Sequence, residues 1–422
     1  MNRDDCLALD AADPLAALRE QFEIPPDLIY LDGNSLGVLP RSAAARVHQV
    51  LRDEWGRDLI RSWNSAGWID LPQRIGDKIA RLVGAKAGEL VVADSTSVNL
   101  FKVLSAASRI VREDAPARRA LLSERSNFPT DLYIAESVGA ELGWEFVLLE
   151  PDEIAARLGP DVAILMLTHV NYRTGRMHDM AALTEQAHAA GALAVWDLAH
   201  SAGAVPVDLH AANADFAVGC GYKYLNGGPG APAFVWAHPR HADRFRQPLS
   251  GWMGHAAPFE FAPGYRPAAG IARYLCGTPP VLSLAALECG VDTVLAAEPL
   301  GGIAALREKS VALTELFATL VEARCDGMSL ALVSPRDVGA RGSQVCLSHA
   351  SHGYAIVQAL IERNVVGDFR AGDARTPDIL RFGFTPLYTR FVDAWDAVEQ
   401  LRQVMASEEW REARFNQRAA VT

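Results

Sequence analysis

The sequence predicts an α/β protein: a large domain with a mainly parallel, doubly wound sheet, followed by a smaller C-terminal α+β domain. Between residues 89 and 236, short apolar runs alternate with helix-length amphipathic stretches. This is the pattern of parallel strands joined by crossover helices. Polar clusters directly follow several of the apolar runs. In doubly wound sheets the carboxyl ends of the strands carry the binding site, so we expect function there.

Length and composition agree with two domains. The chain has 422 residues, enough for two units with a sizeable core. Half of its residues are hydrophobic and 22% are charged, as is ordinary for a globular enzyme. We place an N-terminal segment at residues 1–45, the large domain at 46–300 and the small domain at 301–422.

Charge, cysteines and the N-terminus narrow the class of protein. The net charge of −11 argues against a nucleic-acid partner, because a phosphate backbone favours a basic surface. The six cysteines have no C-x-x-C spacing, so we expect reduced thiols and no metal site. The acidic N-terminus lacks the apolar core of a signal peptide, and no apolar run is long enough to span a bilayer. We expect a cytoplasmic protein without a membrane partner.

The first elements follow from helical periodicity and its interruptions. Residues 4–22 predict a helix with a break at Asp13 and Pro14, and residues 28–31 predict a short strand. A polar turn containing Asn34 follows. Helices are expected over 41–55 and 73–84, and the stretch between them contains Trp63. An isolated tryptophan is more often a packing residue than a ligand contact, so the pattern alone assigns Trp63 no role.

The next strands end in candidate binding residues. A strand at 89–93 runs into a helix that begins with Ser95, Thr96 and Ser97. Hydroxyls cap helix starts, and the free N–H groups there bind anions. Capping accounts for one hydroxyl, which leaves Thr96 and Ser97 to hold a phosphate.

Two further strands, at 119–122 and 162–167, precede polar segments. Phe128 stands directly before Pro129, which holds it extended and suits an aromatic side chain lying flat over a ring. From these residues alone, a simple turn is the safer interpretation of this segment. The second strand ends at Thr168, and a helix over 178–190 follows.

The stretch from 192 to 230 organises the chain. One apolar run ends at Asp197, and a second, 216–220, leads to Tyr222, Lys223 and a glycine-rich turn. A lysine that forms a Schiff base with an aldehyde, and an acid that keeps a pyridine nitrogen protonated, are what pyridoxal phosphate (PLP) chemistry requires. Strand 233–236 completes the expected sheet.

These residues resemble the class V aminotransferase group of fold-type I PLP enzymes. The resemblance rests on Asp197, His200 and Asp208, and on Lys223 after glycine and tyrosine, and it is closest to the kynureninase family. It implies PLP bound as a Schiff base on Lys223, with Asp197 at the ring nitrogen and Tyr222 as a proton relay or phosphate contact. Further cofactor contacts implied by the resemblance are Thr96, Ser97, Phe128, Pro129, Thr130, Asp131, Thr168, His200, Trp252 and Thr278.

The C-terminal part carries the implied substrate contacts. Helices at 282–295 and 303–325 lead to strand-like runs at 330–333 and 345–347 and a helix at 354–363. Arg381 stands among apolar neighbours, and a buried guanidinium needs an anionic partner. That partner is either a nearby acidic side chain or, as the resemblance implies, the α-carboxylate of the substrate. The resemblance adds Asn34 and Trp63 as substrate contacts.

The implied reaction is hydrolysis of L-kynurenine, or of its 3-hydroxy form, to the corresponding anthranilate and L-alanine in tryptophan breakdown. A homodimer with its active site at the subunit interface is also implied. Two alternatives stay open: another class V activity, such as a cysteine desulfurase using Cys325 or Cys346, and a PLP-fold protein without catalysis. The presence of Asp197, Lys223 and Arg381 together argues against the second.

Overall fold

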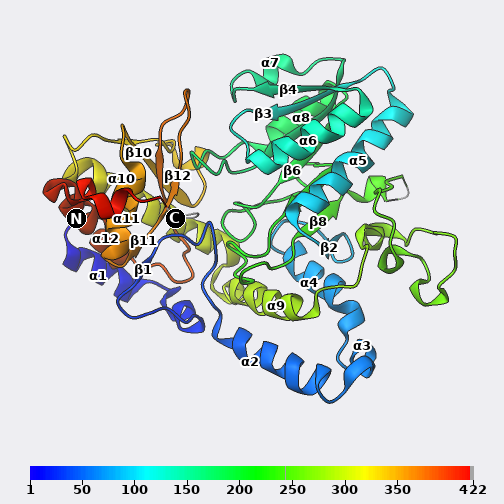
Figure 1. The fold of residues 1–422 in the computed structure, drawn as a ribbon, viewed down its shortest axis with the longest axis horizontal. Helices are drawn as coiled ribbons and strands as arrows, with labels where there is room; N and C mark the ends of the chain where they lie inside the picture. The colour runs from blue at the N-terminus through cyan, green and yellow to red at the C-terminus, as the bar shows by residue number, and fades with distance from the viewer. Residues whose placement is uncertain (243, 419–422) are drawn as a thin grey trace.

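The structure is a computed structural model and describes residues 1–242 and 244–418. Its largest sheet has seven strands in the order β2–β8–β7–β6–β5–β3–β4 (Figure 1). All neighbours from β7 to β4 pair in parallel, whereas β8 runs antiparallel to both β7 and β2. The strands are β2 (Leu90–Val92), β3 (Ala120–Glu124), β4 (Glu145–Leu149), β5 (Val162–Thr168), β6 (Leu193–Asp197), β7 (Phe216–Gly219) and β8 (Phe234–Ala237). The predicted α/β class with a mainly parallel sheet is confirmed.

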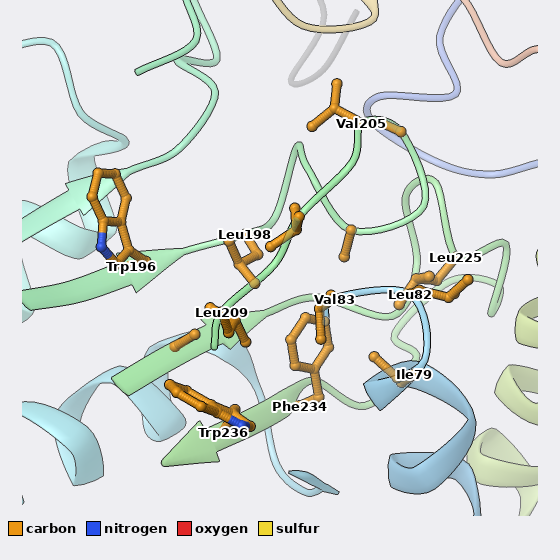
Figure 2. Packing of buried hydrophobic residues seen from close by; sticks show 14 of the residues in the cluster. Ile79, Leu82, Val83, Trp196, Leu198, Val205, Leu209, Leu225, Phe234 and Trp236 are labelled. Atoms are coloured by element: carbon orange, nitrogen blue, oxygen red, sulfur yellow. The ribbon is translucent and has the colours of Figure 1, made fainter. Parts of the chain in front are cut away.

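Both faces of this sheet are buried, which explains why its strands are continuous apolar runs. Val195 packs in the core layer beneath α5, whereas its neighbour Trp196 packs in the layer on the opposite face. Figure 2 shows part of the second layer, with Trp196 and Trp236 on strands of the sheet and Phe234 beside Val83, just after α4. The helices around the sheet are α2 (Arg41–Gln49), α3 (Ser62–Ser65), α4 (Leu71–Ala80), α5 (Thr96–Asp114), α6 (Pro129–Leu142), α7 (Ile154–Arg157), α8 (Met180–Ala189) and α9 (Val281–Leu295).

A second, four-stranded antiparallel sheet has the order β12–β13–β10–β9 and its own hydrophobic core. Its strands are β9 (Leu330–Leu332), β10 (Gln344–His349), β12 (Asp368–Arg370) and β13 (Ile379–Gly383). The helices α10 (Gly302–Arg324), α11 (Gly353–Glu362) and α12 (Phe391–Ser407) pack against it. Figure 1 shows this unit beside the large sheet.

The N-terminal residues join the smaller unit. Helix α1 (Arg3–Ala12) packs on α12, with Arg3 Nε 2.8 Å from Asp396 Oδ1. Strand β1 (Ile29–Tyr30) pairs in parallel with β11 (Val365–Val366). This pairing brings the polar turn around Asn34 against the C-terminal sheet. The predicted domain boundaries at residues 45 and 300 stay predictions.

Some elements differ from the expected ones. The helix expected over 41–55 ends as α2 at Gln49 and continues with π-helical geometry over Val50–Trp55. Pro129 starts α6 at its first turn, where a proline is tolerated because the N–H it lacks would be unpaired there. In the described ranges, no helix is long and apolar enough to cross a membrane.

Candidate active site

The predicted strand-end residues meet at one edge of the large sheet. Thr168 and Asp197 are cross-strand partners at the carboxyl ends of β5 and β6, and Thr168 Oγ1 lies 3.3 Å from Asp197 Oδ2. Lys223 follows the next strand, β7, after a short turn. Because these strands are parallel, their carboxyl ends share one edge, and the three side chains converge there.

A cavity of about 530 Å³ lies at this edge. This volume suits a cofactor together with a small substrate. Eleven predicted site residues line the cavity: Thr96, Ser97, Phe128, Thr130, Asp131, Thr168, Asp197, His200, Tyr222, Lys223 and Thr278. Five others are not among its described lining residues: Pro129, Trp252, Arg381, Asn34 and Trp63.

Lys223 points its amine into the cavity. Burial lowers the pKa of Lys223, and the positive charge of Arg381 lowers it further, although Cys220, Asp197 and Asp131 oppose the shift. Its Nζ lies 3.3 Å from Nε2 of His200. Burial and the Lys223 charge also hold the pKa of His200 well below its ordinary value, so this imidazole is neutral. A lysine in such a place keeps a larger neutral, nucleophilic fraction than one in water.

Two buried carboxylates face this lysine. Asp197 Oδ1 accepts a hydrogen bond of 2.9 Å from the Ala199 N–H, and its Oδ2 is the partner of Thr168. Asp131 is also buried, and within the described chain its Oδ2 has no donor. Burial raises the pKa of both carboxyls, and the Asp197 charge adds to the shift at Asp131. An unsatisfied oxygen beside a second carboxylate fits a cationic N–H group, such as the protonated ring nitrogen of PLP.

The start of α5 forms the anion-binding end of the cavity. Ser95 is the N-cap and accepts a hydrogen bond of 3.3 Å from the Val98 N–H. The hydroxyls of Thr96 and Ser97 are therefore not needed for capping, and both residues line the cavity. The free N–H groups of the first turn of this helix fit a phosphate group.

The residue before this cap, Asp94, also lines the cavity and was missed by sequence reasoning. Its carboxylate pairs with the fully buried Lys102, which also donates a 2.6 Å hydrogen bond to the Tyr274 carbonyl. Lys102 thus neutralises a negative charge next to the phosphate end. Asp94 lies before the N-cap of α5 and Lys102 lies on the helix, so helical spacing alone did not pair them.

Aromatic side chains form the wall over the carboxylates. Phe128 and Tyr172 meet edge to face with ring centroids 5.3 Å apart, and the Lys223 amine lies 6.0 Å from the Phe128 centroid. Phe128 has the extended backbone expected before a proline. Tyr172 also lines the cavity. Its neighbour Asn171 instead binds Glu124 Oε1 at 2.8 Å in a structural network.

Trp63 and Trp252 lie together, apart from the cavity of a single chain. Their ring centroids are 6.1 Å apart, and Trp68 packs on the other side of Trp63. Within the residues that the structure describes, this aromatic group contributes nothing to the lining. The predicted contacts of Trp63 and Trp252 with substrate and cofactor stay predictions.

Arg381 is almost fully buried, and its anionic partner is an acidic side chain of this chain. Its Nε donates to Asp368 Oδ1 at 2.8 Å, and its Nη2 bonds to Asp368 Oδ2. Nη2 also donates to Ser35 Oγ at 2.7 Å, and Nη1 donates to the Tyr172 carbonyl at 2.9 Å. The salt-bridge alternative therefore describes this geometry. Among the residues that the structure describes, four of the five N–H donors of Arg381 have partners, and one on Nη1 is left for a ligand.

Asn34 is also buried, and its side chain has a packing role. Its side chain lies against Gly383 of β13, at a place that a Cβ on this glycine would occupy. Its backbone is bonded to His200. Asn34 thus supports the wall of the cavity from behind.

Cys325 and Cys346, the two candidates for a desulfurase nucleophile, do not form such a site. Cys325 and Cys346 are buried, and burial raises the pKa of both thiols to about 11. A desulfurase-type nucleophile needs an accessible thiol with thiolate character. Neither of these two residues offers one.

The chain is similar in sequence to proteins named kynureninase. A family model described as the kynureninase C-terminal domain matches residues 306–401. A kynureninase from Burkholderia pseudomallei (strain 1106a) is 56% identical over 423 residues, covering 100% of this chain and 99% of that protein. A kynureninase from Pseudomonas fluorescens gives the same identity and coverage.

Solved structures of low sequence identity share the fold. The apo cysteine desulfurase from Thermococcus onnurineus NA1 has a TM-score of 0.79 at 17% identity, covering 93% of this chain and 98% of that one. The cysteine desulfurase CsdA from Escherichia coli has a TM-score of 0.76 at 20% identity, with the same coverage. A structure of C-DES with glycine covalently linked to the PLP cofactor has a TM-score of 0.79 at 16% identity, covering 91% and 98%. These likenesses concern the fold alone.

Proposed function

The chain belongs to the kynureninase family, and from this premise we propose that it hydrolyses L-kynurenine. The reaction adds water across the Cβ–Cγ bond and yields anthranilate and L-alanine. The enzyme is then a hydrolase acting on a carbon–carbon bond in a ketonic substrate. The observation that carries the proposal is 56% identity over the full length of curated kynureninases. The cavity around Lys223 supports it independently.

PLP is the cofactor that this cavity fits. When bound, it supplies an electron sink for the negative charge left when the substrate loses its Cα proton. We assign Lys223 Nζ to bind its aldehyde, Thr96 and Ser97 to hold its phosphate, and Asp197 with Asp131 to face its ring nitrogen. Phe128 would cover one face of the ring. Thr278 lies on the phosphate side in this assignment.

Lys223 and Tyr222 are the proton-handling groups of the proposed mechanism. The depressed pKa of Lys223 leaves its amine able to take the proton from the substrate Cα. Burial raises the pKa of Tyr222, so its phenol keeps its proton and acts as a donor at neutral pH. Neutral His200, 3.3 Å from Lys223 Nζ, holds the amine in place without adding a charge.

Arg381 is the proposed site for the substrate α-carboxylate. Its remaining Nη1 hydrogen is one donor, so a two-point grip requires that Arg381 give up its bond to the Tyr172 carbonyl. Asn34 and Trp63 stay proposed contacts. The choice between kynurenine and its 3-hydroxy form depends on contacts worth about 1–3 kcal/mol in the ring pocket.

A homodimer and a cytoplasmic location complete the proposal. Trp63 and Trp252 form an aromatic group outside the cavity of the single chain. This position is explained if Trp63 and Trp252 of one subunit contribute to the active site of the other subunit. The oligomeric state is measurable by analytical ultracentrifugation of the PLP-loaded protein.

Anthranilate fluorescence on mixing PLP-loaded protein with L-kynurenine tests the function. We expect a fluorescence rise in the native enzyme and none in Lys223→Ala, which should also lose the Schiff-base absorbance. Sulfide release from L-cysteine is the competing readout for a desulfurase. No fluorescence rise with normal absorbance would refute the substrate but keep the cofactor, and unchanged absorbance in Lys223→Ala would refute the cofactor assignment.

A further inference from the structure

The Arg381 site contains more charge than one ion pair. Asp368 and Arg381 are direct cross-strand partners on β12 and β13. Arg370, two residues along β12, places its Nη2 2.7 Å from the same Asp368 Oδ2. Two guanidinium groups thus share a single carboxylate, and these three groups carry a net charge of +1.

A second carboxylate, that of Asp32, lies beside this trio. It enters from the turn after β1, and Ser35 of the same turn links it to the trio. Ser35 Oγ donates to Asp368 Oδ2 at 2.7 Å and accepts from Arg381 Nη2. A hydroxyl has a single proton. Ser35 can give this proton to only one of the two carboxylates at a time, and its contact with either lowers the pKa of that carboxyl.

The other surroundings of Asp32 favour its protonated form. Its Oδ1 is buried, and among the described residues no donor reaches it. An ionised carboxylate with an unpaired buried oxygen is costly. The titratable and charged groups that face Asp32 are Asp368, Arg370, Arg381, Tyr30 and Tyr388. Burial and the Asp368 charge raise the pKa of Asp32 to about 8, against the opposing effect of Arg381.

This charge cluster is connected to the reacting lysine. The turn that carries Asp32 and Ser35 is tied to His200 through the backbone of Asn34, and His200 contacts Lys223. The Gly37 N–H, at the end of the same turn, donates to the Tyr222 carbonyl at 2.7 Å. The positive charge of Arg381 also lowers the pKa of Lys223.

We propose that Asp32 is a positioning residue that sets the charge of the substrate-carboxylate site by gaining or losing its own proton. With Asp32 neutral, Arg370, Arg381 and Asp368 present a net charge of +1 to an incoming carboxylate. With Asp32 ionised, the net charge is zero, and the attraction for a carboxylate is lost. By linkage, a bound carboxylate stabilises the neutral form of Asp32, so that substrate binding takes up a proton. This inference rests on the proposed function, because it needs an α-carboxylate at Arg381.

The sign of the pH effect follows from the raised pKa. Below about pH 8, Asp32 is neutral and binding is tight, and above it binding weakens as the neutral fraction falls. If only the neutral form binds, the KM for L-kynurenine rises about tenfold from about pH 7 to about pH 9. In Asp32→Asn, which cannot ionise, this rise should disappear.

The test compares KM across this pH range in the PLP-loaded native enzyme and in Asp32→Asn. Kynuramine, which lacks the α-carboxylate, is the control ligand, and its binding should show no difference between the two proteins. A second readout is free of turnover: calorimetry of L-alanine binding at about pH 8 in buffers of different ionisation enthalpy. The native enzyme should take up a fraction of a proton that Asp32→Asn does not.

The outcomes separate this inference from the proposed function. Anthranilate release by the native enzyme establishes the function whatever Asp32 does. An equal rise of KM with pH in both proteins would overturn the role of Asp32, since the substrate amine or Lys223 would then account for it. Equal proton uptake on L-alanine binding by the native enzyme and the variant would overturn the role of Asp32 independently. If Asp32→Asn is too unstable for kinetics over the full pH range, Asp32→Ser takes its place in this comparison.

Discussion

Gly37→Ala should move the turn that holds the charge cluster away from Lys223. A Cβ at this position would lie 2.5 Å from the Lys223 carbonyl oxygen and 2.7 Å from the Asn226 Cα, and it would also meet the Asn226 side chain. Ordinary van der Waals contact begins at 3.4 Å. The backbone segments must therefore separate by about 0.9 Å, although the Gly37 N–H bond to Tyr222 holds them together.

Two magnitudes follow from this displacement. Overpacking of this kind costs about 1–3 kcal/mol of stability. A shift of about 1 Å at a reacting group can cost about 100-fold in rate, so we expect kcat to fall by about 10- to 100-fold. The backbone angles of Gly37 are ordinary, so the effect comes from the close approach and not from a conformation that only glycine adopts.

The assay is steady-state anthranilate release together with urea unfolding of the PLP-loaded protein. Gly264→Ala is the matched control, because a Cβ there meets no described atom within 4 Å and its backbone angles are also ordinary. We expect this control to match the native enzyme in both measurements. Native kcat in Gly37→Ala would refute the argument that this turn must stay within contact distance of Lys223.

Two further predictions concern buried carboxylates. Because burial raises the pKa of Asp131, its ionised form costs stability above the ordinary aspartate range, and this cost grows as pH rises toward the raised pKa. Asp131→Asn should therefore stabilise the cofactor-free protein by about 1–3 kcal/mol at neutral pH while weakening PLP binding, as urea unfolding and PLP titration would measure; a destabilised apoprotein would contradict this. Asp215 is buried among Arg240, His188 and His241, and its pKa is lowered mainly by the hydrogen bonds of these histidines, against burial. Asp215→Asn should cost about 3–5 kcal/mol in urea unfolding at neutral pH, and the difference should shrink in acid as the native carboxylate protonates; the exposed Asp114→Asn, which loses only its pair with Arg244, should cost less than about 1 kcal/mol.

Much of the site could be predicted because parallel strands gather their carboxyl ends. Thr168, Asp197 and Lys223 are far apart in sequence, yet each follows an apolar run, and topology alone brings such positions together. The same logic identified Thr96 and Ser97 at the start of α5. The strand pattern predicted where these side chains lie, whereas their chemical roles came from the family resemblance.

The partner of Arg381 could not be predicted in the same way. Asp368 and Arg381 are paired by the register of two antiparallel strands that are joined by an irregular connection. A shift of one residue would point one of the two side chains to the other face of the sheet, and nothing in the local sequence fixes that register. Ser35 and Asp32 reach the same place only because β1 pairs with β11, a contact between the two ends of the chain.

The ionisable groups of the cavity share one property that connects fold and function. Burial raises the pKa of Asp131 and Asp197 and lowers the pKa of Lys223 and His200, so each shift favours a neutral form. If these residues served only to pack the interior, replacing them by apolar residues would increase the free energy of unfolding. Burying these ionisable groups costs free energy of folding, and ligand binding offsets that cost. A ligand with a cationic ring nitrogen and an anionic phosphate meets the carboxylates at one end of the cavity and the free N–H groups of α5 at the other. The PLP-loaded protein should therefore unfold at a clearly higher temperature than the apoprotein. Asp131→Asn should narrow that difference, because a neutral amide gains less than a carboxylate from the cationic ring nitrogen.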